Sequence, residues 1–340
     1  MILRVALIGL GYWGNNLARN IILHPDFELA AVVDSDNLAC DKSQLVFNCN
    51  FYESIEMLPS NLDIVFVSTR PGSHFELAKG LLKKTKTIVL AKPACSSLSE
   101  AEQLLRECME FNKSANIFVD YTYHFSPLFK KFKAYYLENF EKEEVIEITS
   151  YRTSLGIIQS DVSVIADLLS HDLSIFLKML PLDSLKVQCI SSSSTKRGKA
   201  TSVMANLHWS TGHVLSCHAS WISPQKIRKI SLIGDSKALI VSELNTSKKL
   251  EVINFDSISN QLDDKEKTLR NQSFSLGDTF SPEIHDEESI FVELTELANA
   301  YKYGDTQELY SLSDAVTIWK IIEALENSLV DSGREIEVVL

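Results

Sequence analysis

The first residues of the chain constrain its fold more than any other segment. A largely apolar run, 2–8, leads directly into a GxGxxG pattern at Gly9, Gly11 and Gly14, and a helix-compatible stretch, 15–23, follows. Gly9 permits a tight turn, Gly11 lets backbone N–H groups approach a pyrophosphate, and Gly14 allows the helix to pack close to the strand. The helix N-terminus then faces the phosphates with its positive dipole end. This order of strand, glycine turn and helix predicts a dinucleotide-binding unit.

A second apolar run predicts how the dinucleotide is selected. Residues 27–33 end in Asp34, which lies 25 residues after Gly9, near the offset of about 20 residues expected of a ribose-binding acid. Asp36 follows and no Arg or Lys occurs until Lys42, so a 2′-phosphate would meet uncompensated negative charge. We therefore predict NAD rather than NADP. The alternative is a solvated acid that merely ends a strand.

Composition limits the class of protein. The 340 residues are enough for two domains, and 45% hydrophobic with 23% charged residues is typical of a globular protein. No apolar run approaches the roughly 20 residues of a membrane helix, and the chain starts without a signal-peptide pattern, so we expect a cytoplasmic protein without membrane contact. A net charge of −12 disfavours nucleic-acid binding. No CxxC pair occurs, so we expect no metal site, and reduced thiols at Cys40, Cys49, Cys95, Cys108, Cys189 and Cys217.

Strand and helix patterns alternate as far as residue 121. Such alternation predicts a doubly wound parallel sheet, and thus an NAD-binding Rossmann domain over residues 1–121. After the glycine turn, its predicted strands are 27–33, 63–68, 87–91 and 116–120, and its predicted helices include 73–84 and 97–113.

Beyond residue 121 the pattern changes to consecutive strands with short connections. This predicts an α+β domain with a mostly antiparallel open sheet over residues 122–340, for substrate binding and oligomerisation. The expected strands are 145–153, 185–191, 201–210, 213–221, 227–233 and 238–242, and the expected helices are 127–139, 163–180, 288–301 and 313–331. Residues 255–288 are polar and without periodicity, which predicts a long loop of unassigned role.

Two groups of residues could carry chemistry. Lys92 and Pro93 follow the strand 87–91 at the carboxyl edge of the sheet, where the nicotinamide end of a dinucleotide is expected. A lysine there would stabilise oxyanion character on a reacting hydroxyl, whereas the alternative is an ordinary surface lysine. The segment Thr69 to Gly72, followed by His74 in the first turn of a helix, lies at the same edge.

The second group lies on the predicted helix 163–180. Asp167, His171 and Ser174 occupy positions i, i+4 and i+7 of one polar stripe. Histidine titrates near neutrality and suits proton abstraction from an alcohol, with Asp167 orienting it. The alternative is a solvated polar face. Oxidation of a secondary alcohol needs a hydride acceptor, a base and a cation that stabilises the alkoxide, and the sequence offers all three.

On these residues the chain resembles the Gfo/Idh/MocA oxidoreductases over nearly its whole length. Within the family it is similar to bacterial nucleotide-sugar 3-dehydrogenases of the UDP-N-acetylglucosamine or UDP-N-acetylglucosaminuronate type. The subgroup likeness rests on the segments 11–20, 161–175 and 220–224. The resemblance implies catalytic Lys92 and His171 supported by Asp167, and dimers or tetramers. The predicted cofactor-binding residues are Gly9, Gly11, Tyr12, Trp13, Gly14, Asp34, Ser68, Thr69, Pro71, His74 and Lys92.

The resemblance predicts oxidation of a hydroxyl, at C3, of a nucleotide-linked amino sugar used in surface-polysaccharide synthesis. The direction of the reaction in the cell stays open. A dehydrogenase of a free sugar, inositol or another polyol is one alternative. A catalytically silent NAD-binding sensor is another, because Ala91 stands where the family usually has a glutamate before Lys92. Arg152 and the segment 221–228 could hold substrate or could be ordinary sheet and interface residues.

Overall fold

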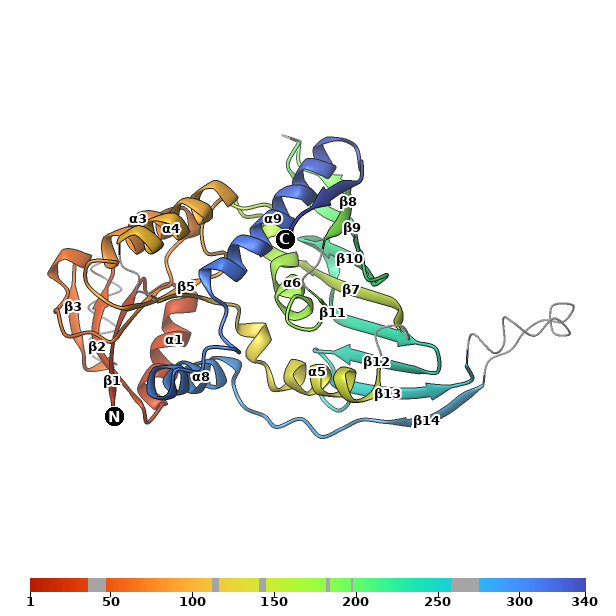
Figure 1. Ribbon diagram of the computed structural model, residues 1–340, viewed down its shortest axis with the longest axis horizontal. Coiled ribbons are helices and arrows are strands. Elements are labelled where there is room, and N and C mark those ends of the chain that lie inside the picture. Colours follow the sequence, from red (N-terminus) through yellow and green to blue (C-terminus); the bar gives the residue numbers. More distant parts are fainter. Residues whose placement is uncertain (36–46, 112–115, 141–144, 182–183, 197, 258–274) are drawn as a thin grey trace, which may run out of the picture. The chain divides into compact units, whose positions relative to one another are not determined.

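The protein is described by a computed structural model that covers residues 1–35, 47–111, 116–140, 145–181, 184–196, 198–257 and 275–340 (Figure 1). Asp36, Cys40 and Lys42, which entered the sequence argument, lie outside these ranges, as do residues 112–113 of one predicted helix and 258–274 of the predicted loop. Within the described ranges, no helix combines the length and the apolar composition needed to cross a bilayer.

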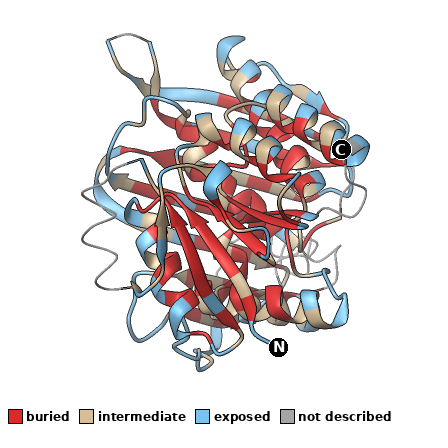
Figure 2. Cartoon of the chain, turned by 90° about the vertical axis from the view of Figure 1, so that its left-hand side faces the viewer, coloured by how far each residue is buried: buried red, intermediate tan, exposed pale blue. Residues whose placement is uncertain are grey.

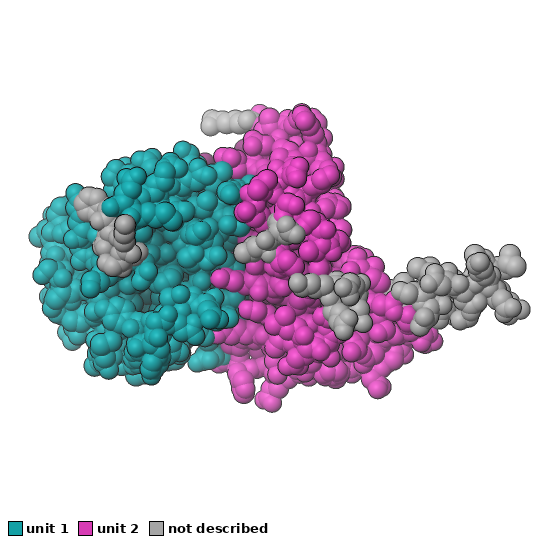
Figure 3. All heavy atoms as spheres, viewed as in Figure 1, with its two compact units in different colours: residues 1–126, 287–320 teal, residues 127–286, 321–340 magenta. Residues whose placement is uncertain are grey.

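The chain forms two compact units (Figure 3). Unit 1 contains residues 1–126 and 287–320, and unit 2 contains residues 127–286 and 321–340. The sequence suggested one division, between residues 121 and 122, whereas the chain returns to unit 1 at residue 287. The physical reason is that the helix after residue 288 buries Ile290, Leu294 and Leu297 in the core of unit 1. A sequence pattern shows that a helix has an apolar face but not which core receives it.

Unit 1 is built on a six-stranded parallel sheet with the strand order β3-β2-β1-β4-β5-β6. Helices α3 and α4 lie on one face of the sheet, and α1 and α8 on the other (Figure 1). The prediction of a doubly wound sheet is confirmed. The strands are β1 (Leu3–Ile8), β2 (Phe27–Val33), β3 (Asn50–Tyr52), β4 (Ile64–Val67), β5 (Thr87–Ala91) and β6 (Asn116–Asp120). The helices are α1 (Tyr12–Leu23), α3 (Pro71–Leu81), α4 (Leu98–Phe111) and α8 (Ser289–Tyr303).

The strands of unit 1 are buried on both faces, which Figure 2 shows as a continuous buried layer. In β4 all four residues, Ile64 to Val67, are buried. Parallel strands covered by helices on both sides need such unbroken apolar runs, and each fully buried Val, Leu, Ile or Phe side chain contributes about 1.5–3 kcal/mol. The short strand β3 was not predicted, because three half-exposed residues carry little apolar signal.

Unit 2 contains a nine-stranded sheet with the order β14-β13-β12-β11-β7-β10-β9-β8-β15. All neighbouring strands are antiparallel except β7 and β10, which confirms the prediction of a mostly antiparallel sheet. The central strands are β7 (Val145–Leu155), β8 (Leu185–Ser194), β9 (Ala200–Trp209), β10 (Val214–Ser220) and β11 (Ile222–Gly234). The outer strands are β12 (Lys237–Ser242), β13 (Leu250–Phe255), β14 (Leu276–Phe280) and β15 (Ile336–Val338).

Two elements of unit 2 differ from the sequence prediction. Strand β14 lies within the segment 255–288 that was expected to be a loop, because its five residues are all exposed and give no apolar alternation. The expected helix 163–180 is instead a π-helical turn, Ile165–Leu169, followed by the α-helix α6 (Ser170–Phe176). Helix α5 (Pro127–Asn139) lies where predicted, and so does α9 (Leu312–Val330), which begins in unit 1 and continues into unit 2 after residue 320.

Candidate active site

The glycine loop between β1 and α1 has the geometry of a phosphate cradle. Gly9 has a φ of +93°, a conformation that favours glycine. A Cβ on Gly14 would lie 2.0 Å from the Gly9 carbonyl oxygen, so only glycine lets α1 start this close to β1. A Cβ on Gly11 would meet nothing within 4 Å. The open backbone at Gly11, at the N-terminus of a twelve-residue helix, therefore fits a dinucleotide pyrophosphate.

Side chains at the ends of β2 and α1 fix this loop. The Leu10 N–H donates to Oδ2 of Asp34 at 2.6 Å. The Asn15 amide donates to the carbonyl oxygens of Leu10 at 2.6 Å and of Gly11 at 3.0 Å. Asp34 is thus held beside the loop, at the strand end where a ribose would lie. Asn15 was not among the predicted site residues.

Residues after β4 join the same loop from the neighbouring strand. The Ser68 hydroxyl donates to the Gly9 carbonyl oxygen at 2.7 Å. The hydroxyl groups of Thr69 and Ser73 lie 2.7 Å apart, and Pro71 is the first residue of α3. The structure therefore brings the predicted residues Ser68, Thr69 and Pro71 to the edge of the sheet that carries the glycine loop.

His74 links two loops at this edge. Its imidazole is fully buried, with Nδ1 3.1 Å from the Pro93 carbonyl oxygen and Nε2 3.0 Å from the Thr69 carbonyl oxygen. Burial lowers the pKa of His74, and the backbone hydrogen bonds partly oppose this effect. His74 thus ties the segment after β4 to the turn after β5, while a direct contact with cofactor stays a prediction.

Lys92 occupies that turn. It directly follows β5, and the peptide bond between Lys92 and Pro93 is cis. Ala91, the last residue of β5, is the register partner of Asp120 on β6. A lysine at this position can stabilise negative charge on a substrate oxygen. The carboxyl ends of β4, β5 and β6 therefore present Thr69, Lys92 and Asp120 in adjacent positions of one sheet edge.

The second group of predicted residues lies in unit 2, at the π-helical turn. Oδ2 of Asp167 accepts a hydrogen bond from the Trp221 indole Nε1 at 2.8 Å. His171 is half-buried and is the second residue of α6. Its carbonyl oxygen accepts a hydrogen bond from the Ser174 hydroxyl at 2.7 Å. A π-helical turn contains one more residue than an α-helical turn and often marks a functional site. The expected α-helical stripe is therefore altered: Ser174 is buried and bonds the backbone.

A buried charge network lies beneath α6. Arg152, on β7, is 2% exposed and its Nη2 donates to Oδ1 of Asp172 at 2.6 Å. Oε1 of Glu243 lies 3.5 Å from the same Nη2, and burial raises the pKa of Glu243 while Arg152 opposes this rise. Arg152 is therefore anchored in the sheet, as one of the two sequence interpretations held. In the part of the chain that the structure describes, no cluster of His, Cys, Asp or Glu is arranged to hold a metal.

The parallel sheet of unit 1 and its glycine phosphate cradle define a dinucleotide-binding Rossmann domain. Residues 3–120 match the sequence model of GFO_IDH_MocA, the oxidoreductase family with an NAD-binding Rossmann fold. The resemblance found in the sequence is therefore confirmed over residues 3–120, where the chain matches this family and its NAD-binding Rossmann fold. When bound, NAD would lie on the glycine loop and Asp34 and would supply the hydride acceptor.

Individual relatives support the fold. Myo-inositol 2-dehydrogenase from Thermotoga maritima is 28% identical over 180 residues, which span 50% of this chain and only 52% of that protein. UDP-N-acetylglucosamine 3-dehydrogenase GnnA from Acidithiobacillus ferrooxidans has a TM-score of 0.79 at 17% identity, covering 97% of this chain and 98% of that one. An oxidoreductase from Agrobacterium radiobacter, solved with NAD+, L-tartaric acid and magnesium, has a TM-score of 0.78 at 19% identity, covering 99% and 98%.

Proposed function

We propose that the protein oxidises a secondary hydroxyl, at C3, of a nucleotide-linked amino sugar in the cytoplasm, for surface-polysaccharide synthesis. One observation carries the choice of substrate class. The segments 161–175 and 220–224, which carry the likeness to nucleotide-sugar dehydrogenases, meet in unit 2 through the Trp221 indole and the Asp167 carboxylate. The two segments thus build one local structure around His171. A cytoplasmic location accords with the five described cysteines, which form no disulfide.

The residues divide the chemistry among them. His171 accepts the hydroxyl proton, Asp167 holds the imidazole in a productive orientation, and Lys92 stabilises the alkoxide as the C3 hydride leaves. The substrate loses its hydroxyl proton to His171 and a hydride from C3, which bound NAD would accept. Its O–H and C–H bonds break and a C=O bond forms.

The first experiment measures formation of reduced nicotinamide from NAD with a panel of UDP-amino sugars, free sugars and myo-inositol. We expect turnover with a UDP-amino sugar, and a loss of at least about 100-fold in His171→Ala and Lys92→Ala. Matched controls are His285→Ala and Lys86→Ala, two exposed residues, the latter next to the opposite end of β5. Normal turnover by His171→Ala would refute the assignment of the base.

A free polyol is the second candidate substrate. The likeness to myo-inositol 2-dehydrogenase from Thermotoga maritima favours it, although that match spans about half of each chain. Saturable turnover of myo-inositol or a free sugar, without turnover of any UDP-sugar, would establish this candidate in place of the first.

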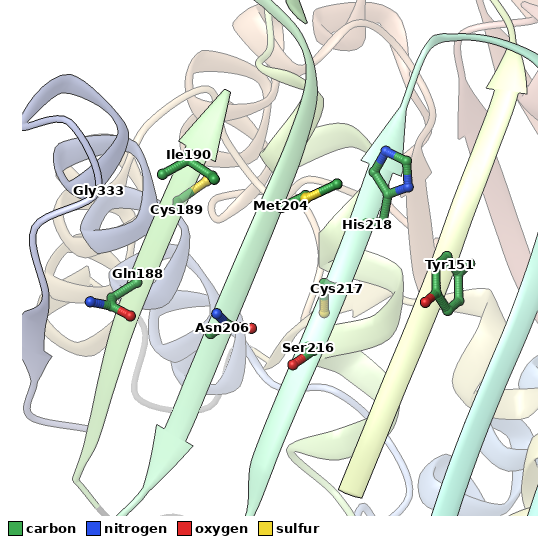
Figure 4. Close-up of a pocket in the computed structure, with 10 residues that line it drawn as sticks. All are labelled: Tyr151, Gln188, Cys189, Ile190, Met204, Asn206, Ser216, Cys217, His218 and Gly333. Carbon is green, nitrogen blue, oxygen red and sulfur yellow. The ribbon is translucent and has the colours of Figure 1, made fainter. Parts of the chain in front are cut away.

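We also propose that the protein forms a homo-oligomer through one face of the unit 2 sheet. A row of side chains crosses four strands in register: Ile190 on β8, Met204 on β9, His218 on β10 and Tyr151 on β7 (Figure 4). Ile190, Met204 and Tyr151 are each between 42% and 51% exposed. A hollow of about 370 Å³ lies on this face, and none of its ten lining residues is Asp, Glu, Lys or Arg.

The chemistry of this face suits a second copy of the chain. Each copy carries a net charge of −12, and a surface without charged side chains avoids local repulsion where two copies meet. Depletion of charged residues is also typical of interface cores. Four strands, spaced about 4.8 Å apart and about 30 Å long, offer roughly 600 Å², somewhat less than the roughly 800 Å² that each partner contributes to a standard interface.

Sedimentation velocity tests the interface. We expect the wild type to sediment as a dimer or tetramer at micromolar concentration and Met204→Glu to sediment as a smaller species. Met57→Glu, which changes an exposed methionine of unit 1, is the matched control. A monomeric wild type, or an unchanged mass for Met204→Glu, would contradict the proposal.

A further inference from the structure

Helix α8 carries a carboxyl group inside the core of unit 1. Glu293 is 3% exposed and lies between Ile290 and Leu297 on the buried side of the helix. Burial raises the pKa of Glu293 well above its ordinary value, and the neighbouring Asp120 carboxyl adds to the rise. An acid in such a position is unusual, because charged residues are almost never fully buried unless they are paired. Neither the predicted mechanism nor the glycine pattern uses this residue.

The contacts of Glu293 lead to the glycine loop. Its side chain hydrogen-bonds to Asp120, whose Oδ2 accepts the indole N–H of Trp13 at 2.7 Å. Oδ1 of Asp120 accepts from the Thr122 hydroxyl. Among the described residues, Oε2 of Glu293 has no hydrogen-bond partner. The three side chains therefore join α8, the end of β6 and the first turn of α1.

Counting protons shows which acid is ionised. An indole nitrogen can only donate, so Oδ2 of Asp120 must act as an acceptor. Two carboxyl groups that share a hydrogen bond need one proton between them. Asp120 already accepts two other hydrogen bonds, which stabilise its anion, whereas the unpartnered oxygen of Glu293 would leave an anion there poorly solvated. Glu293 is therefore the neutral acid and the donor, and Asp120 is the anion.

The position of Trp13 gives this arrangement a role. Trp13 is the second residue of α1, and the N-terminus of α1 carries the backbone that faces the pyrophosphate. Asp120 is 2% exposed, lies at the end of β6, and is separated from β1 by β4 and β5 in the sheet. The indole contact thus ties the start of α1 to β6, which lies three strands away from β1 in the same sheet.

We propose that Glu293 is a positioning residue for the cofactor: its carboxylic acid holds Asp120 as an acceptor, Asp120 holds the Trp13 indole, and Trp13 fixes the loop from Gly9 to Gly14 for the pyrophosphate. The side chain of Glu293 acts through Asp120 and Trp13 and makes no contact with NAD. The affinity of the free enzyme for NAD therefore depends on a carboxyl group in the protein core. Because NAD is the family's cofactor, this inference is independent of the sugar substrate.

A double-mutant cycle in NAD affinity, measured by titration calorimetry, tests the chain of contacts. We expect Trp13→Phe and Glu293→Leu each to weaken NAD binding about tenfold, because each removes a hydrogen bond to a charged group. The double variant should be no weaker than about tenfold, since both changes break one chain. Losses that multiply to about 100-fold would overturn the proposal.

Rescue by an isosteric amide separates positioning from packing. Glu293→Gln keeps a donor toward Asp120, so its NAD affinity should stay within about threefold of the wild type. The Trp13 indole N–H resonance, assigned with Trp13→Phe, should move in Glu293→Leu and stay in place in Glu293→Gln. Glu296→Leu, one turn along α8 and partly exposed, is the matched control. If Glu293→Gln binds NAD as weakly as Glu293→Leu, the role of the Glu293 donor is refuted. If Glu293→Leu does not fold, Asp120→Asn replaces it in the cycle.

Discussion

Each unit contains an indole that donates to a carboxylate, and the two contacts differ in what surrounds them. In unit 1 Trp13 donates to Asp120 at 2.7 Å, and in unit 2 Trp221 donates to Asp167 at 2.8 Å. Asp120 is buried at a strand end with the acid Glu293 behind it, whereas Asp167 is half-buried on a π-helical turn. The same hydrogen bond thus joins the first turn of α1 to the end of β6 in one unit, and a strand connection to the π-helical turn in the other. We therefore expect the two contacts to have different roles, because Asp120 ends a strand of the NAD-binding sheet whereas Asp167 lies on the π-helical turn before His171.

The largest expected effect concerns the buried ion pair between Arg152 and Asp172 of α6, the helix that follows the π-helical turn of unit 2. Arg152→Met would leave the buried carboxylate of Asp172, 1% exposed, without its cation. Removing one partner of a buried ion pair destabilises a protein by about 3–5 kcal/mol. We expect a loss of that size in the free energy of unfolding in urea. A loss below about 1 kcal/mol, the value of an exposed pair, would show that α6 does not depend on this anchor.

The next effect distinguishes the two carboxylates directly. Asp167→Asn should lower turnover by about 100-fold and leave NAD affinity unchanged, because it alters the support of the base. Asp120→Asn should instead weaken NAD binding. Steady-state kinetics and titration calorimetry on the same two variants check both statements. If both substitutions changed NAD affinity equally, the assignment of one contact to each function would be wrong.

The acid behind Asp120 should make stability depend on pH. The pKa of Glu293 is raised in the folded protein, so the folded state keeps a proton that the unfolded chain releases above its ordinary pKa of 4.5. This stabilisation is complete below that pH and is lost as pH rises toward the folded-state pKa. The free energy of unfolding of the wild type, relative to Glu293→Gln, should fall as pH rises above 4.5, by at most about 1.4 kcal/mol per pH unit, until the folded-state pKa is reached. Urea titrations across this range check the slope, and a constant difference would contradict it.

The smallest effect comes from a surface pair that joins the same two regions as the Trp13 contact. Both guanidinium nitrogens of Arg19, on α1, donate to Glu288, which precedes α8, at 2.7 and 2.8 Å. Arg19→Ala should cost at most about 1 kcal/mol of stability, because both side chains are about half exposed. NAD affinity should not change. If Arg19→Ala weakened NAD binding as much as Trp13→Phe, NAD affinity would depend on any contact between α1 and α8 and not on the Trp13 hydrogen bond in particular.

The sequence predicted most of unit 1 and the local identity of its cofactor loop. Gly9 has a positive φ and Gly14 has no room for a Cβ, so at these two positions the glycine pattern reports a local demand that can be recognised without a structure. Asp120 and Glu293 were not predicted, because they are 173 positions apart and meet only after folding. One signal was present: Glu293 interrupts the apolar positions Ile290, Leu294 and Leu297 of α8.

In unit 2 the helix expected over 163–180 was predicted only in part. The spacing of Asp167 and His171 indicated one helix face, but a π-helical turn has no single-sequence signature and changes the angle between them. Trp221 was noted in the segments 220–224 and 221–228, but its hydrogen bond to Asp167 was not predicted, because the two residues are 54 positions apart. Strand β14 was missed because its five exposed residues carry no alternation.

The return of the chain to unit 1 has a consequence for how the protein is made. Helix α8 completes the apolar core around Leu17 and Ile21 of α1, yet it is translated only after the 160 residues from 127 to 286. At about 5–20 residues per second, the ribosome needs roughly 8–32 seconds to cover that interval. For that time the nascent cofactor-binding unit presents an uncovered apolar surface at α1, which makes it a substrate for chaperones until its last helix emerges.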